Sequence, residues 1–269
     1  MNMIAVAVVS VTSIGVICAV VLSTVSRFMA VKLDERVISI LECLPGANCG
    51  ACGFPGCSGY AEALVLNKYV KTNFCTPGGD AVSAKLSAIL GVEAKSVEQL
   101  SAVVHCRGNC KVQIKKMNYK GLQSCLAAKQ LYGGEAACSF GCLGYGDCMA
   151  VCPNHAVCME DSLAHINTTH CTGCGLCVRT CPNNVISIEN SGKAVTVFCN
   201  NIEKGALVRK KCAVGCIGCG RCARECSSEA ITIKDNLARI DYEACTGCGR
   251  CAEVCVTGSI QFVRTGILS

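Results

Sequence analysis

The sequence predicts an α+β chain in three parts: an apolar amino-terminal helix, a small helical domain rich in cysteine, and two tandem copies of a small α+β domain. Cysteine accounts for 28 of the 269 residues, a density at which cysteine chemistry usually determines the architecture. The amino-terminal residues form a long uncharged run, and the second half of the chain repeats itself at one fixed offset. These observations divide the chain into residues 1–27, 28–95, 96–135, 136–198 and 199–269.

Residues 1–27 are expected to be a transmembrane anchor. Residues 3–26 carry no charge and are rich in Val, Ile and Ala, a run long enough to cross a bilayer as a helix. A cleaved signal peptide is the alternative, but no basic segment precedes the run and its length exceeds a signal peptide's apolar core. Arg27, Lys32 and Arg36 follow. Since basic residues favour the cytoplasmic side, we expect one pass through the cell membrane and a cytoplasmic location for the other residues.

The composition favours metal sites over disulfide bonds. A reducing cytoplasm keeps thiols free, and aromatic residues make up only 4% of the chain, so an ordinary apolar core is thin. The formal net charge of +6 would suit nucleic acid or anionic lipid. No basic stripe interleaved with aromatic residues is present, so nucleic acid is not an expected partner.

Residues 28–95 are expected to form a helical domain around four cysteines. The spacing is Cys-x2-Cys-x4-Cys, with the fourth cysteine after seventeen further residues. These residues are Cys49, Cys52, Cys57 and Cys75. Glycine and proline in this run allow the backbone to bend closely around a [4Fe–4S] cluster, and a tetrahedral zinc site is the alternative. Helical patterns begin at residue 58 and cover residues 81–90, where they would pack over the loop.

An offset of 74 residues superimposes the two α+β copies. Cys138, Cys142, Cys148 and Cys152 fall on Cys212, Cys216, Cys222 and Cys226. Cys171, Cys174, Cys177 and Cys181 fall on Cys245, Cys248, Cys251 and Cys255. Eight coincidences at one offset indicate a duplicated domain, with residues 136–198 and 199–269 as the copies and residues 96–135 as a linker before them.

The cysteine runs have the Cys-x2-Cys-x2-Cys-x3-Cys spacing of bacterial ferredoxins, with Pro182 after the first complete run. In that spacing three cysteines bind one [4Fe–4S] cluster and the fourth reaches across to a neighbouring cluster. The crossing predicts three ligand sets: Cys152, Cys171, Cys174 and Cys177; Cys216, Cys219, Cys222 and Cys255; and Cys226, Cys245, Cys248 and Cys251. Zinc has no use for a cysteine shared between distant runs, so zinc is not expected here.

The fourth set is irregular because the offset carries Tyr145 onto Cys219. We expect Cys138 to replace the missing thiolate, which gives the set Cys138, Cys142, Cys148 and Cys181. A three-iron or lost cluster at Tyr145 is the alternative. The sequence therefore predicts about five [4Fe–4S] clusters. One more on Cys106, Cys110 and Cys125 with a further ligand is the alternative to their burial as small apolar residues.

Seven short apolar runs predict strands in the two copies. They cover residues 156–160, 163–166, 185–189, 194–197, 230–234, 237–241 and 259–263. The chain order makes each copy a small ferredoxin-like α+β domain with two hairpins. Five clusters of about −2 each would change the formal charge of +6 to about −4, so the basic residues serve as counter-charge. No nucleotide-binding glycine motif or catalytic triad is present, and we expect electron transfer without bond chemistry.

The order of an uncharged span, the spacing of Cys49 to Cys75 and two ferredoxin-like repeats resembles the B subunit of the Rnf complex. The resemblance implies a membrane-anchored subunit that accepts electrons from soluble reduced ferredoxin. It would pass them to the other membrane and cytoplasmic subunits of a ferredoxin:NAD⁺ oxidoreductase that translocates Na⁺ or H⁺. Cys226 and Cys255 depart from the ferredoxin pattern because no proline follows them. A ferredoxin-like subunit of another membrane oxidoreductase, a hydrogenase or dehydrogenase, is the alternative.

Overall fold

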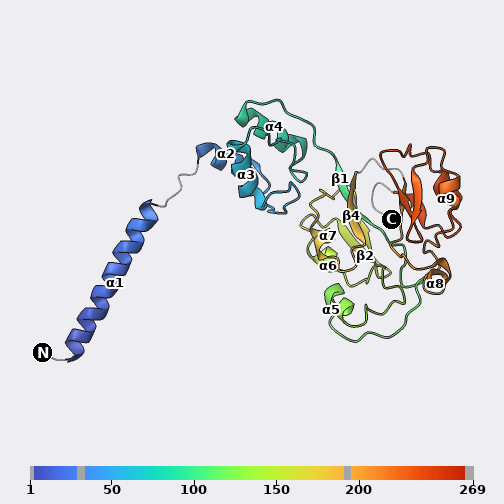
Figure 1. Cartoon of the computed structure of the whole chain (residues 1–269), viewed down its shortest axis with the longest axis horizontal. Helices are drawn as coiled ribbons and strands as arrows, with labels where there is room; N and C mark the ends of the chain where they lie inside the picture. Colours follow the sequence, from blue (N-terminus) through green and yellow to red (C-terminus); the bar gives the residue numbers. More distant parts are fainter. Residues whose placement is uncertain (1–2, 29–33, 191–194, 264–269) are drawn as a thin grey trace.

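The computed structural model describes residues 3–28, 34–190 and 195–263 (Figure 1). Helix α1 (Met3–Phe28) is a continuous helix of 26 residues that extends away from the remaining domains. Among the described residues, no helix combines the length and the hydropathy needed to cross a bilayer. The transmembrane anchor predicted for residues 1–27 is therefore unconfirmed and stays a prediction.

The small helical domain contains three helices: α2 (Glu35–Cys43), α3 (Gly56–Leu66) and α4 (Gly79–Leu90). Asp34 caps α2 by accepting a hydrogen bond from the backbone N–H of Arg36 at 2.9 Å. Ile40, Tyr60 and Leu86 meet in the core between the three helices. The Tyr60 hydroxyl donates to the carbonyl of Lys71 at 2.7 Å, which ties α3 to the loop before α4. The two helices expected from residues 58 and 81 onward are confirmed.

The first α+β domain follows the helical domain along the chain. Its elements are β1 (Leu100–Val104), α6 (Asp147–Ala150), β2 (Val157–Glu160), β3 (Leu163–Ile166), α7 (Leu176–Thr180) and β4 (Ile186–Asn190). Strands β2 and β3 form an antiparallel hairpin, with Val157 opposite Ile166. Strand β1 pairs antiparallel with β4, so the first and last strands of the domain close it.

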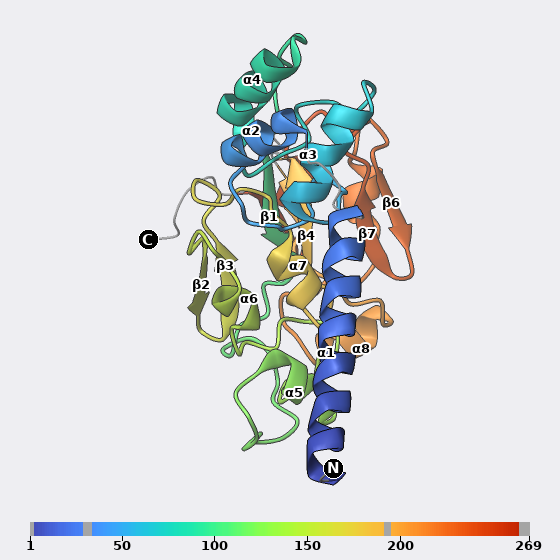
Figure 2. The ribbon, with the colours of Figure 1, turned by 90° about the vertical axis from the view of Figure 1, so that its left-hand side faces the viewer.

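The second α+β domain repeats this arrangement. Its elements are β5 (Val195–Val197), α8 (Gly205–Arg209), α9 (Arg221–Arg224), β6 (Ile231–Lys234), β7 (Leu237–Ile240), α10 (Arg250–Glu253) and β8 (Ile260–Phe262). Strands β6 and β7 form the hairpin, and β5 pairs with β8. Figure 2 shows the β2–β3 and β6–β7 hairpins on opposite sides of β1 and β4.

The strand pairing corrects the expectation of two hairpins per copy. All seven expected strands are present, but residues 186–190 do not pair with residues 195–197. They pair instead with β1, which lies in the segment that the sequence predicted as a linker. Likewise, β5 belongs with β8 of the second domain, although residues 136–198 were expected to form the first copy. The strands of the β1–β4 and β5–β8 pairs are far apart in the chain. No turn connects the two strands of either pair directly, so the sequence contains no local signal for their pairing.

An insertion distinguishes the first domain from the second. Thirty-eight residues lead from the end of β1 to Cys142 (104 to 142), against nineteen from the end of β5 to Cys216 (197 to 216). The insertion includes helix α5 (Cys125–Gln130). It shifts β1 out of the 74-residue register, which is why the repeat alone did not reveal this strand.

Hydrogen bonds from residues after β1 join the two α+β domains. The backbone N–H of Ile114 donates to Lys211 at 3.0 Å, and that of Ala213 donates to Val112 at 3.2 Å. The Arg107 guanidinium donates to the carbonyl of Gly258, at the end of the second domain, at 2.5 Å. The insertion and the second domain are thus held together by regular backbone pairing and by a long charged side chain.

Candidate metal centres

Four cysteines of the helical domain line one cavity of about 310 Å³: Cys49, Cys52, Cys57 and Cys75. They are the four that the sequence groups together. Cys57 lies in the first turn of α3, and Cys75 lies shortly before α4. Gly53 and Gly56 between these ligands both have φ near +85°, a conformation that suits glycine and lets the loop turn back sharply.

The thiols of this cavity are close enough to influence one another. Burial raises the pKa of Cys75, and the neighbouring Cys57, Cys49 and Cys52 raise it further. A hydrogen bond from the backbone of Gly78 acts in the opposite direction. Four thiolates at such separation repel one another, so their common ionised form requires a cationic core between them.

A second cavity, of about 330 Å³, is lined by Cys152, Cys171, Cys174 and Cys177 of the first α+β domain. This is one of the sets expected from the ferredoxin spacing. Burial raises the pKa of Cys177 to about 11, and the other three thiolates contribute to the rise. The N–H of Ala102 in β1 donates to Cys171 Sγ at 3.3 Å, and that of Ala156 donates to Cys152 Sγ at 3.3 Å. Strand β1 is therefore part of this site.

In the structure, Cys125 lies where Cys138 was expected, beside the other cysteines of the irregular set. A cavity of about 370 Å³ is lined by Cys125, Cys142, Cys148 and Cys181. Cys138, predicted to complete this set, lines another cavity together with Cys106, Cys199 and Cys212. Burial raises the pKa of Cys148 to about 12, and nearby Cys142, Cys125, Cys181 and Cys177 also raise it.

Cys125 reaches this cavity because the insertion folds back onto the cysteine run. Asp147, at the start of α6, accepts hydrogen bonds from the Ser124 hydroxyl at 2.9 Å and from the N–H of Leu126 at 3.1 Å. Tyr145, which replaces the missing cysteine, packs edge-on against Tyr119 of the insertion, with ring centroids 5.6 Å apart. The insertion therefore brings an additional thiol to this cavity and provides an aromatic partner for Tyr145.

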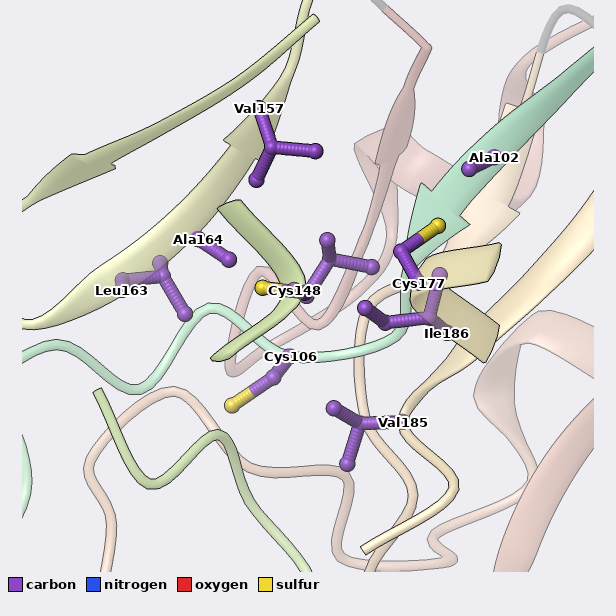
Figure 3. Packing of buried hydrophobic residues seen from close by; sticks show 10 residues of the cluster. Ala102, Cys106, Cys148, Val157, Leu163, Ala164, Cys177, Val185 and Ile186 are labelled. Atoms are coloured by element: carbon purple, nitrogen blue, oxygen red, sulfur yellow. The ribbon is translucent and has the colours of Figure 1, made fainter. Parts of the chain in front are cut away.

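Figure 3 shows how these cysteines lie in the core of the first domain. Cys148 and Cys177 are packed among apolar side chains such as Val157 and Ile186. The thiol of Cys177 points to the opposite side from that of Cys106. The core thus separates distinct groups of thiols instead of gathering all of them at one point.

The second α+β domain brings together the four thiols of one expected set and three thiols of the other. Burial raises the pKa of Cys222 to about 11, with Cys216, Cys255 and Cys219 acting in the same direction. For the other set, burial raises the pKa of Cys251, and Cys245 and Cys248 raise it further. Cys226 belongs to the same apolar cluster as Cys251.

The geometry fits iron–sulfur clusters. Within the described residues, no three His, Cys, Asp or Glu side chains converge closely enough to hold a single metal ion. A cube of four irons and four sulfides is wider than one ion, so its thiolates surround a cavity. The three cavities described above have this form, and their thiols receive backbone N–H groups, as the sulfurs of cluster ligands require.

Sequence reasoning missed Cys125 because this residue lies in the segment expected to be a linker, although the 74-residue offset carries it onto Cys199. Of the remaining cysteines, Cys18, Cys110 and Cys158 are exposed. Cys43 is half-buried and lines none of the cavities described above. The expected alternative set of Cys106, Cys110 and Cys125 is not brought together, because Cys106 and Cys125 line different cavities.

Protein-family models agree with this distribution of sites. A model described as "Putative Fe-S cluster" matches residues 44–77, which contain the cysteines of the helical domain. A "4Fe-4S binding domain" matches residues 164–187 of the first α+β domain. A "4Fe-4S dicluster domain" matches residues 215–259 of the second. Iron–sulfur domains are therefore present in all three parts, and those of the two α+β domains are of the [4Fe–4S] type.

Three relatives resemble the chain over most of its length. The B subunit of a proton-translocating ferredoxin:NAD(+) oxidoreductase complex from Clostridium ljungdahlii is 44% identical, covering 90% of this chain and 85% of that protein. The B subunit of a Na(+)-translocating complex from Acetobacterium woodii is 36% identical, covering 85% and 69%. The B subunit of an ion-translocating oxidoreductase complex from Methanosarcina acetivorans is 36% identical, covering 86% and 87%. The chain therefore belongs to the family of B subunits of ion-translocating ferredoxin:NAD(+) oxidoreductase complexes, the Rnf complexes.

Proposed function

We propose that this chain accepts electrons from reduced ferredoxin and passes them to the other subunits of an Rnf-type complex that couples ferredoxin:NAD⁺ oxidoreduction to Na⁺ or H⁺ translocation. The observation that carries the proposal is the succession of cysteine sets through all three domains. The sets are Cys49, Cys52, Cys57 and Cys75; Cys152, Cys171, Cys174 and Cys177; Cys125, Cys142, Cys148 and Cys181; Cys216, Cys219, Cys222 and Cys255; and Cys226, Cys245, Cys248 and Cys251.

The bound clusters would supply one-electron centres, since a [4Fe–4S] cluster changes its charge by one unit without breaking a bond. The protein's contribution is to hold four thiolates around each cavity and to exclude water from it. Apolar side chains such as Tyr60, Leu176 and Met159 line the cavities and restrict solvent. Backbone N–H donors, such as that of Ala102 on Cys171, stabilise the more negative reduced form.

The second α+β domain is the proposed point of electron entry. Its middle cysteines, Cys219 and Cys248, are exposed, whereas the equivalent Cys174 of the first domain is half-buried. Arg221 and Arg250 follow these two cysteines closely and are themselves exposed. An exposed ligand flanked by a cation suits contact with an acidic electron carrier, because opposite charges speed and orient the encounter.

The helical domain is the proposed exit. The Arg179 guanidinium in α7, between Cys177 and Cys181, donates to the carbonyl of Cys49. This hydrogen bond connects the ligand loops of two domains directly. The helical domain lies between α1 and the two α+β domains along the molecule (Figure 1). Electrons that enter at the second domain would thus leave beside the amino-terminal helix.

The amino-terminal segment is the proposed membrane anchor, with the cluster domains on the cytoplasmic side. Support comes from the sequence, in which residues 3–26 are uncharged and basic residues follow. If the anchor is real, the full chain will stay with membranes after alkaline carbonate washing, and a chain lacking residues 1–28 will be released. Equal release of both chains from the membranes would contradict the proposed anchor.

Charge reversal at the entry surface tests the proposed function. The variant Arg221→Glu/Arg250→Glu should bind the same iron as the parent chain, because neither side chain is a ligand. Its oxidation of reduced ferredoxin should slow by about tenfold or more at low salt, since two favourable charges become unfavourable. Stopped-flow absorbance of ferredoxin mixed with the oxidised chain measures this rate.

Two controls complete this test. Arg239→Glu, at an exposed position of β7 that adjoins no cysteine in the sequence, should leave the rate within about twofold of the parent, because steering depends on where the charge lies. Dithionite, a small reductant, should bleach all variants equally.

Membranes lacking the chain should also lose ferredoxin-dependent NAD⁺ reduction. Full NAD⁺ reduction without the chain would exclude the proposed role, and loss of hydrogenase activity instead would favour another oxidoreductase.

A further inference from the structure

We propose that Cys106, Cys138, Cys199 and Cys212 bind an additional [4Fe–4S] cluster at the junction of the two α+β domains. The four cysteines line one cavity of about 320 Å³, a volume within the range of the cysteine cavities described above. Cys106, Cys138 and Cys212 are 7–9% exposed, and Cys199 is half-buried. None of the three matching family models includes all four of these residues.

The duplication supplies these cysteines in equivalent pairs. Cys106 lies two residues after the end of β1, and Cys199 lies two residues after the end of β5. Cys138 and Cys212 are related by the 74-residue offset, four residues before the cysteine runs of their domains. Each domain therefore contributes the same two positions to the shared cavity. Both copies keep these two cysteines, and all four thiols face the same cavity between the domains. We therefore interpret them as one ligand set, to which each domain contributes two equivalent cysteines.

The hydrogen bonds repeat the same symmetry. The N–H of Cys142 donates to Cys106 Sγ at 3.3 Å. The backbone of Cys216, the equivalent of Cys142, makes a hydrogen bond to Cys199 that lowers its pKa, although burial is the larger effect and raises the value to about 11. Gly108 and Asn201 each lie two residues after their cysteine. The Cys106 thiol donates to the Gly108 carbonyl at 3.9 Å, and the backbone of Asn201 makes a hydrogen bond to Cys199 that lowers its pKa.

Buried donors surround the other two thiols. The Asn201 side-chain amide, 1% exposed, donates to Cys138 Sγ at 3.4 Å. The backbones of Val214 and Gly215 make hydrogen bonds to Cys212. Cys138 also lies within electrostatic range of the other three thiols. A buried neutral thiol gains little from a charged or amide donor, but a thiolate bound to iron gains much more.

Glycine leaves room where two of these thiols approach the backbone. A Cβ on Gly141 would lie 3.4 Å from Cys106 Sγ and 3.7 Å from Cys138 Sγ. Both sulfurs thus face the same small region of backbone from different segments of the chain. Arg107 lines the cavity as well, and its guanidinium donates to the Gly258 carbonyl. The shared donors and the common cavity account for the four cysteines better than burial as separate apolar residues, which requires neither.

The position of the site implies a connecting role, and this part rests on the proposed electron-transfer function. Cys142 belongs to a cluster set of the first domain, and Cys216 belongs to a set of the second. Each makes a backbone hydrogen bond to a thiol of the junction site. An electron moving between the domains would leave its donor oxidised by one unit and its acceptor reduced by one, with no bond made or broken.

Iron and acid-labile sulfide per chain test the site directly. The full chain, purified and reconstituted without oxygen, should contain about 24 of each, as six cubanes require. Cys138→Ala and Cys212→Ala should each lower both counts by about four. Cys43→Ala, half-buried outside the cavities, and Cys110→Ala, exposed, should match the parent. The proposal would be overturned if the parent chain bound only about 20 irons and Cys138→Ala bound the same number. Because this outcome depends on the iron content of the parent chain, poor folding of a variant could not produce it.

A second measurement uses a variant that keeps every thiol. Asn201→Leu should bind as much iron as the parent but shift one centre to a lower reduction potential, because a donor to Cys138 is lost. Asn200→Leu is the matched control, since the Asn200 amide donates to the Asn184 carbonyl at 3.4 Å and not to sulfur. Potentiometric titration followed by EPR resolves the shift. Identical titrations for both variants would contradict the site. Neither measurement uses ferredoxin, so slow ferredoxin oxidation would count against the proposed function alone.

Discussion

Removal of iron and sulfide from the purified chain is expected to abolish the cooperative unfolding of both α+β domains. The described strands form four sheets of only two strands each. A sheet of two strands is marginal by itself in water, and helices of four or five residues such as α6, α7, α9 and α10 have no independent stability. The free energy of cluster binding is then largely the free energy of folding.

The cores of these domains lead to the same expectation. The main apolar cluster of the first domain has ten buried residues, and three of them are cysteines. The corresponding cluster of the second domain has nine, again with three cysteines. Removing the metal would leave these thiols facing one another with no group between them, so the packing around them would be lost.

Circular dichroism during heating and limited proteolysis measure this effect. Chain treated with a chelator under reducing conditions should melt without a sigmoidal transition and should be cut throughout residues 100–263. Chain carried through the same steps without chelator is the control and should keep its transition and a resistant fragment. A metal-free chain with an unchanged melting curve would show that side-chain packing alone maintains these domains.

The second large effect concerns the pair Cys125 and Cys138. Each single substitution by alanine should remove about four irons, and Cys125→Ala/Cys138→Ala should remove about eight. The expectation follows from the two cavities: Cys125 lies with Cys142, Cys148 and Cys181, whereas Cys138 lies with the junction cysteines. Iron analysis of the three variants, with Cys110→Ala as the control, measures the losses.

The additivity of these losses distinguishes the two ligand assignments. If Cys138 were the fourth ligand of the Cys142 set, Cys125→Ala would retain all of its iron. The double variant would then lose no more than Cys138→Ala does. If the iron losses of the two single variants add up in the double variant, the two thiols bind separate clusters. Two substitutions in one ligand set could remove the iron of that cluster only once.

Local ligand geometry could be predicted from the sequence because short spacings reflect short loops. Cys171, Cys174 and Cys177 are held by a turn in which Gly173 adopts φ of +67°, and a Cβ there would lie 2.7 Å from the carbonyl of Leu100. The turn therefore requires glycine at this position between the cysteines. Because of this requirement, glycine and the cysteine spacing together form a motif that can be recognised in the sequence. The seven strands were predictable for a similar reason, since alternating apolar residues bounded by turns are a local signal.

Long-range partners could not be predicted in the same way. Strand β1 pairs with β4 across more than eighty residues, and nothing in residues 100–104 indicates that partner. Cys125 lines the cavity of Cys142, Cys148 and Cys181 from within a segment that the sequence predicted as a linker. Cys138 is the nearest candidate along the chain for the missing thiol, but it lines a cavity with Cys212 and accepts a hydrogen bond from Asn201. Sequence spacing could not indicate this cavity because its cysteines come from both domains.

The positions of the iron atoms test the account most directly. An anomalous difference map recorded at the iron absorption edge, from crystals of the full chain grown without oxygen, should show iron at each cysteine set. One cluster should lie among Cys125, Cys142, Cys148 and Cys181, and another among Cys106, Cys138, Cys199 and Cys212. Iron bound by Cys138 together with Cys142, or a junction cavity without iron, would contradict these ligand sets.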